Sequence, residues 1–171
     1  MKKSLLALAV LGAFAGVASA QSSVNLSGTI DLNARYVKND GSDSRLSLSQ
    51  DGINSSELRF RGVEDLGGGL KAAFFLVSGV NADTGTSNAK FWNRKATIGL
   101  MGNWGEVRLG RDYTPHFWNY TFYDPFGTQG VASNLALTGS TGGSTTVRAS
   151  NTIGYLSPNF GGFSGPQTTG K

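Results

Sequence analysis

Apolar and polar residues alternate strictly near the start of the chain, from Val24 to Tyr36. The even positions hold Val, Leu, Gly, Ile, Leu, Ala and Tyr, and the odd positions between them hold Asn, Ser, Thr, Asp, Asn and Arg. A period of two predicts a β-strand with one apolar and one polar face. Soluble strands usually run for about 5–6 residues and membrane-spanning strands for about 9–11. The length of this segment therefore favours a strand that crosses a membrane.

Five more segments are predicted as strands, and they are separated by turns and loops rich in Gly, Asn, Asp and Ser. They cover residues 57–63, 70–79, 91–101, 106–113 and 146–156. The connections after the second, fourth and sixth strands are short, whereas those after the first, third and fifth are longer, an asymmetry typical of outer-membrane barrels. The sequence holds no run of 18 apolar residues that would suit a membrane helix. The predicted fold class is therefore all-β, a transmembrane antiparallel β-barrel.

The first twenty residues have the three parts of a secretory signal peptide. Lys2 and Lys3 give a charged start, residues 5–17 are almost continuously apolar, and Ala18-Ser19-Ala20 fits the small-residue cleavage rule. An N-terminal membrane anchor is the alternative, but a spanning helix needs about 20 apolar residues. We therefore expect residues 1–20 to be cleaved, with residues 21–171 forming the mature chain.

Composition narrows the possible function classes. The chain of 171 residues has 25 glycines, 11% aromatic residues, no cysteine and a mean hydropathy of −0.16. These values exclude a helical membrane protein and a disulfide scaffold, and they suit many short turns. Removing residues 1–20 lowers the 15 basic side chains to 13 against 11 acidic ones, a net charge of +2. A charge this small, from scattered residues, gives no case for a nucleic-acid partner.

The chemistry-bearing side chains do not form a recognisable catalytic or cofactor site. His116 is the single histidine and has no G-x-S-x-G signature near it, so we expect no enzyme activity. One histidine and no cysteine argue against a transition-metal site, while calcium at loop carboxylates stays open. The glycines at 67–69 lack the Lys-Ser/Thr and helix of a phosphate-binding loop and are predicted to form a strand-joining turn. No cofactor is expected.

Residues 113–147 form the longest stretch without periodicity. Structureless loops of this length are uncommon and usually functional or disordered. Six aromatic side chains between Phe117 and Phe126 argue against disorder. We therefore expect a loop that folds back against an apolar surface.

Five segments of the chain together resemble the general Gram-negative porins, the trimeric diffusion channels of the outer membrane. They read SSVNLSGTID at 22–31, LRFRGVEDLGGGLKAAF at 58–74, RKATIGLMGNWGEVRLGRDYTP at 94–115, DPFG at 124–127 and RASNTIGYLSPNFGGF at 148–163. The resemblance implies a sixteen-stranded barrel around a water-filled pore, with six strands in this chain. It also implies that residues 113–147 fold into the pore as a constriction loop.

The resemblance also implies a charged constriction, in which basic side chains on the wall face acidic groups on the loop. Arg94 and Arg148 match two basic positions of the family, while Glu57 stands where the family usually has a basic residue. Alternation places Arg59 and Arg61 on the same inward face.

Asp124 is the only acidic residue between positions 113 and 147, so the loop supplies a single acidic side chain to the constriction. Because lumenal arginines favour anions, we expect a weak anion preference. The alternative is that several of these arginines are only solvated wall residues. Phe75 and Val77 depart from the family by placing apolar side chains on the inward face. Four aromatic residues near strand ends are predicted to lie at the membrane interfaces: Tyr36, Trp92, Trp104 and Tyr155.

The predicted function is an outer-membrane porin that passes small hydrophilic solutes and ions, as a homotrimer in outer-membrane lipid. The family pattern would continue into a seventh strand after Ser164, and six strands alone leave open edges in lipid. The sequence is therefore expected to be the N-terminal portion of a porin, a fragment. A non-channel envelope protein, such as a surface adhesin or a structural outer-membrane protein, is the alternative. Planar-bilayer conductance distinguishes the two.

Overall fold

The computed structural model describes residues 23–134, 147–159 and 161. Residues 1–20, the predicted signal peptide, and residues 135–146 of the predicted loop lie outside this part of the chain. The elements run in the order β1 (Ser23–Thr29), β2 (Leu32–Val37), β3 (Arg45–Gln50), β4 (Glu57–Gly67), β5 (Leu70–Asn81), β6 (Thr86–Ser87), β7 (Lys95–Gly102), β8 (Gly105–Tyr113), α2 (Pro115–Tyr123) and β9 (Arg148–Leu156).

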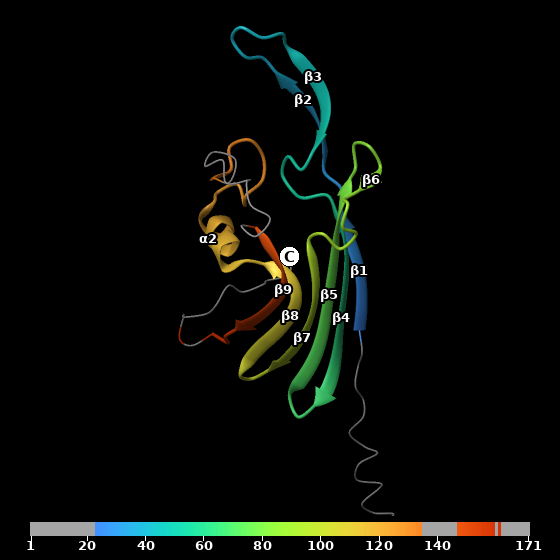
Figure 1. The fold of residues 1–171 in the computed structure, drawn as a ribbon, viewed down its shortest axis with the longest axis vertical. Helices are drawn as coiled ribbons and strands as arrows, with labels where there is room; N and C mark the ends of the chain where they lie inside the picture. Colours follow the sequence, from blue (N-terminus) through green and yellow to red (C-terminus); the bar gives the residue numbers. More distant parts are fainter. Residues whose placement is uncertain (1–22, 135–146, 160, 162–171) are drawn as a thin grey trace, which may run out of the picture.

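Six of the strands form one antiparallel sheet in the order β1-β4-β5-β7-β8-β9, and the short β6 pairs with β5 (Figure 1). Each of the six segments predicted from alternation contributes a strand, but the first strand ends at Thr29 and the fourth begins at Lys95, so these two are shorter than predicted. Tight turns join β4 to β5 and β7 to β8. Gly67, Gly68 and Gly69 all have positive φ, which explains the glycine run at the first of these turns. Within the described residues, β1 and β9 each pair on one side only.

The long strand predicted from Val24 to Tyr36 is in fact two strands that separate at Ile30 and Asp31. The backbone N–H of Asp31 leaves the ladder and donates to Ser56 Oγ at 3.0 Å. Its carboxylate accepts the backbone N–H groups of Ile53 and Asn54, both at 2.7 Å. The polar residue therefore ends β1, although its position keeps the alternation.

β2 continues away from the main sheet and forms a hairpin with β3, whose register pairs Leu32 with Gln50 and Val37 with Arg45. Figure 1 shows this hairpin extending beyond one end of the sheet. The segment of β3 reads RLSLSQ and alternates, but it was not predicted as a strand. This strand has six residues and lies within the connection predicted between the first and second strands.

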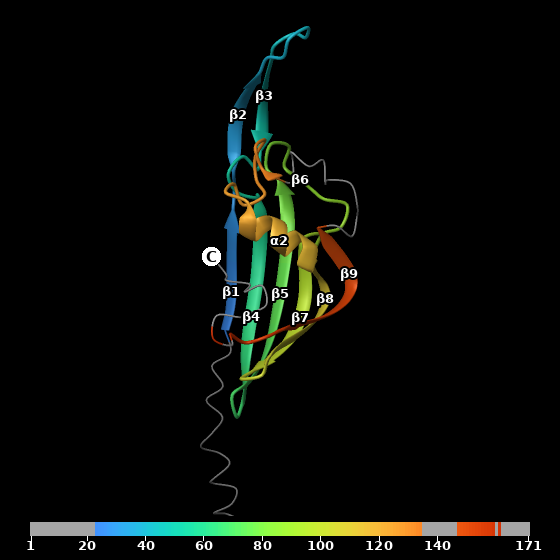
Figure 2. The same cartoon turned by 90° about the vertical axis from the view of Figure 1, so that its left-hand side faces the viewer.

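The predicted loop after Tyr113 begins with a helix, α2. Thr114 accepts the N–H of Phe117 on its hydroxyl at 3.2 Å, and Pro115 starts the first turn. Both features favour helix initiation. Figure 2 shows α2 crossing in front of the strands, so the start of the loop covers one face of the sheet. Among the described residues, no helix has the length and hydropathy needed to cross a membrane.

The two faces of the sheet differ in an unusual way. On the face away from α2, one register row contains Val24, Ile98, Leu109 and Ile153, which are 70%, 60%, 43% and 82% exposed. Of the described residues, the buried apolar side chains are Val77 and Phe117 alone, whereas most buried side chains are polar or charged. Soluble proteins show the opposite distribution. The outer face therefore has the character of a lipid-facing surface.

The four aromatic residues predicted for the membrane interfaces lie in different places. Trp104 and Tyr155 stack with ring centroids 6.4 Å apart next to the β7–β8 turn, and the Tyr155 hydroxyl donates to the Trp104 carbonyl. Trp92 packs edge-on against Phe60 and Phe91. Tyr36 is exposed on the β2–β3 hairpin. The first pair is the arrangement expected of an interface belt.

Candidate pore wall

The face of the sheet under α2, called here the inner wall, carries charged side chains beside apolar ones. Strand register places Arg61 opposite Phe75, and it places Arg59 opposite Val77, which in turn stands opposite Lys95. Side chains opposite one another on the same face are neighbours. Arg59 and Arg61 therefore share the inner wall, as alternation predicted, and they lie directly beside the two apolar residues.

Glu57 is almost completely buried at the start of β4, where it is bound by two arginines. Its carboxylate pairs with Arg59 and, at 3.5 Å, with Nε of Arg94. Glu57, at a position where the resemblance implies a basic residue, thus neutralises neighbouring arginine charge. Arg59 is consequently held by an internal partner.

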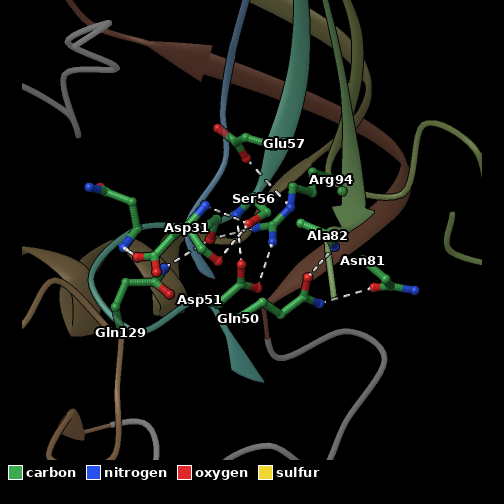
Figure 3. Close-up of polar contacts among 12 residues, drawn as sticks. Asp31, Gln50, Asp51, Ser56, Glu57, Asn81, Ala82, Arg94 and Gln129 are labelled. Carbon is green, nitrogen blue, oxygen red and sulfur yellow. Dashed lines mark hydrogen bonds and ion pairs between the residues drawn. The ribbon is translucent and has the colours of Figure 1, made fainter. Parts of the chain in front are cut away.

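Arg94 lies at the centre of a polar cluster, called here the rim network, where the hairpin base meets the sheet (Figure 3). Its guanidinium also donates to Ser55 Oγ at 2.8 Å and pairs with Asp51 at 3.5 Å. The side-chain amide of Gln129, from the segment after α2, donates to the same Ser55 hydroxyl at 3.0 Å. Arg94 therefore ties the hairpin base to the loop that covers the inner wall.

Ser56 anchors the other side of the rim network and is fully buried. Its N–H donates to Asp51 at 2.6 Å, and its hydroxyl donates to the Asp31 carbonyl at 3.2 Å. Its own carbonyl accepts the N–H of Val80 at 3.0 Å. The turn between β3 and β4 is thereby fixed against β5.

A second charged cluster, which sequence reasoning missed, lies where β7 meets β8. Lys95 is 3% exposed and pairs with Asp112 at 2.9 Å. Arg108 pairs with Asp112 at 2.8 Å and with Glu106 at 2.7 Å. Asp112 shares the face of Glu106 and Arg108, the other even positions of β8, and the register shift between Gly110 and Asp112 is a β-bulge whose extra residue lies in β9.

Lys95 is also surrounded by aromatic rings. Its ammonium lies 5.0 Å from the ring centroid of Phe75, 5.6 Å from that of Tyr113 and 5.9 Å from that of Trp118. Such contacts stabilise a desolvated cation. They also dock the beginning of α2 onto the wall, since Tyr113 precedes the helix and Trp118 belongs to it.

Two of the predicted arginines have no carboxylate partner among the described residues. Arg61 is exposed, and no hydrogen bond or ion pair joins it to the described part of the chain. Arg148 donates to the Tyr113 hydroxyl at 3.2 Å and stacks 4.7 Å from the centre of that ring. Among the predicted arginines, Arg61 and Arg148 are therefore the two whose charge no carboxylate of the described residues compensates.

Asp124, predicted as the acid that faces the arginines, is 7% exposed. Its carboxylate accepts the backbone N–H groups of Phe126, Thr128 and Asn134 at 2.9, 3.0 and 2.9 Å. These three bonds shape the segment after α2. The described contacts of Asp124 thus organise the loop, and its place in a constriction stays a prediction.

A cavity of about 270 Å³ lies between the inner wall and α2. Its lining includes Arg59, Arg61, Phe75, Val77, Arg108 and Trp118. In residues 23–134, 147–159 and 161, no three His, Cys, Asp or Glu side chains gather as they would to hold a metal ion. The described lining of the cavity combines charged and apolar side chains.

Comparison with known proteins agrees with this geometry. The family model described as "Gram-negative porin" matches residues 7–166. Outer membrane porin protein 32 of Delftia acidovorans is 46% identical over 168 residues, covering 95% of this chain and 48% of that protein. An outer membrane porin protein of Bordetella pertussis is 38% identical over 180 residues, covering 95% and 46% respectively.

A solved structure, "Anion-selective porin from Comamonas acidovorans", superposes with a TM-score of 0.74 at 41% identity, covering 84% of this chain and 45% of that one. The chain spans about half the length of the curated relatives it matches. The match supports the predicted fold class, a transmembrane antiparallel β-barrel. The described sheet is an open portion of the wall of such a barrel. The chain belongs to the Gram-negative porin family.

Proposed function

We propose that this chain forms part of the wall of a water-filled outer-membrane channel for the passive diffusion of small hydrophilic solutes and ions. The observation that carries the proposal is the distribution of side chains between the two faces of the sheet, which is the reverse of that in a soluble protein. Its exposed face is apolar, while its covered face holds buried charges and a cavity under α2. Passive diffusion requires no turnover, so no catalytic residue is assigned.

The proposed location is the outer membrane, where the names of both sequence relatives place those proteins. The proposed assembly is a homotrimer, which the resemblance to trimeric porins implies. The docking of Tyr113 and Trp118 on Lys95 supports residues 113–147 as the inward-folded constriction loop. Residues 1–20 are proposed to be the export signal.

The proposed selectivity is a weak preference for anions. On the inner wall and its rim, Lys95, Arg59, Arg94 and Arg108 have carboxylate partners. Arg61 and Arg148 have none among the described residues, and unpaired cations lower the energy of anions in a narrow pore. The solved relative is titled anion-selective, which agrees with this sign.

The test is to purify the complete gene product from outer membranes and to reconstitute it in planar bilayers. We expect stepwise currents and, in a KCl gradient, a reversal potential displaced toward the chloride equilibrium potential. A displacement toward the potassium equilibrium potential would contradict the anion preference. An absence of current steps would favour a non-channel envelope protein.

A further inference from the structure

The inner wall contains apolar surface where a water-filled channel has a polar lining. Phe75 stands opposite the unpaired Arg61, and Val77 stands opposite Arg59 in the next register row. Trp118 of α2 faces the same cavity, whose volume is about 270 Å³. A free guanidinium and an apolar patch are thus combined in one recess.

We propose that this cavity is a subsite for organic anions that join one carboxylate to an apolar ring or short chain. The inference rests on the proposed channel function and names the solute class that the same wall favours. In the subsite, Arg61 binds the carboxylate, and Phe75 with Trp118 contacts the apolar body. Small inorganic anions use only the first of these interactions.

Arg61 is the cation in this cavity that is free to bind a solute. Lys95 and Arg108 share Asp112, and Arg59 is paired with Glu57, so each of these charges already has a carboxylate. Arg61 is exposed and has no such partner in the described part of the chain. A guanidinium presents two parallel N–H donors that match a carboxylate. One solute carboxylate therefore fits the site without displacing an internal ion pair.

The size and openness of the recess set the kind of solute. Pockets for drug-sized ligands usually enclose about 300–1,000 Å³, so this cavity suits a single ring or a short chain. A single available arginine, open to water, binds such an anion weakly. Weak binding suits a channel, in which a solute must leave as readily as it enters.

Inhibition of the chloride current tests the proposal on the complete gene product in bilayers. The probes are benzoate, acetate and benzyl alcohol, which separate the contribution of the ring from that of the charge. We expect benzoate to halve the current at a concentration about tenfold lower than acetate. This factor corresponds to about 55 Å² of apolar surface buried at about 25 cal/mol per Å². Benzyl alcohol at the benzoate concentration should leave the current unchanged.

Two variants assign the effect to the cavity. Phe75→Ser should bring the half-blocking concentration of benzoate up to that of acetate. Arg35→Gln, on β2 of the hairpin, removes the same charge as Arg61→Gln but lies outside the lining of the cavity. It should leave the benzoate effect intact, whereas Arg61→Gln should weaken it severalfold.

The outcomes separate this inference from the proposed function. Equal half-blocking concentrations of benzoate and acetate in an anion-selective channel would overturn the subsite alone. Equal inhibition by benzoate and benzyl alcohol would also overturn it, because the ring without the carboxylate would suffice. If Phe75→Ser does not fold, the three probes on the unmodified protein still decide. A protein without channel current would overturn the proposed function instead.

Discussion

Arg61 and Arg94 look equivalent in the sequence, since each lies in a segment predicted as a strand and each is a candidate for the basic side of the constriction. The structure places them in opposite environments. Arg94 contacts Ser55, Asp51 and Glu57 and is nearly buried, whereas Arg61 is exposed and unpaired among the described residues. The comparison separates an arginine that holds the wall together through internal partners from one that has none among the described residues and that we propose is available to a solute. Variants that remove one of these side chains, or a partner in an internal ion pair, test the distinction.

The largest expected effect follows from breaking the pair between Lys95 and Asp112. Asp112→Asn leaves Lys95 and Arg108 partly uncompensated, and removing one partner of a buried ion pair costs about 3 kcal/mol. We expect this loss in the free energy of unfolding, measured in urea for the complete gene product in detergent. The unpaired charge should also increase the anion preference.

Asp43→Asn, in the turn of the β2–β3 hairpin, is a matched control for Asp112→Asn. The same change of charge in an exposed turn should alter the free energy of unfolding by less than about 0.5 kcal/mol. A similar loss in both variants would show that net charge, and not the buried pair, determines stability.

The next effect comes from the rim network. Arg94→Gln removes charge-assisted bonds to Asp51 and Ser55, with an expected cost of about 2 kcal/mol in the free energy of unfolding. Gln129 should then be held less firmly, so proteases should cut the segment after α2 faster. Arg45→Gln on β3 is the control. Unchanged protease resistance of Arg94→Gln would contradict the assignment of Arg94 as a tie.

These environments explain which parts of the site the sequence could predict. Alternation correctly placed Arg59 and Arg61 on one face, because side-chain direction within an unbroken strand depends only on position. It also puts Asp112 on the face of Glu106 and Arg108, but it could not predict the ion pair of Asp112 with Lys95, which depends on how β7 and β8 align. Nor could it place Asp31 at the end of β1, because the groups that bind Asp31 lie more than twenty residues away.

Some missed features had local signals. Thr114 and Pro115 form a helix-start sequence before an aromatic run, and this signal predicts α2 without any tertiary information. The alternation of β3 was also visible. The pairing state of each arginine was not, because Ser55 and Glu57 contact Arg94 across about forty residues of sequence.

A smaller effect is expected from pH at the base of the hairpin. The backbone N–H groups of Asn54 and Ile53 lower the pKa of Asp31 below its ordinary value of 3.8. The folded chain thus favours the carboxylate, so its contribution to stability is complete above pH 3.8 and is lost as the pH falls through the lowered pKa. The protection of the Ile53 and Asn54 amides against hydrogen exchange, relative to the intrinsic rate at each pH, should fall in that range. In Asp31→Asn this protection should be low at every pH, and pH-independent protection in the unmodified protein would contradict the prediction.

The smallest effect on stability is expected for Arg61→Gln, and it completes the comparison with Arg94. Because Arg61 has no bond to the described chain, its loss should change the free energy of unfolding by less than about 0.5 kcal/mol. Its charge is nevertheless available to solutes, so the reversal potential in a KCl gradient should move toward zero, further than in Arg94→Gln. If the two variants moved it equally, internal pairing would not decide which arginine a solute meets. If Arg94→Gln moved the reversal potential further than Arg61→Gln, the charge in the rim network would contribute more to anion selectivity than the charge of Arg61. Stability and selectivity are expected to respond to different arginines. A guanidinium that is paired with internal carboxylates attracts an anion in the pore only weakly, because the opposite charges largely cancel.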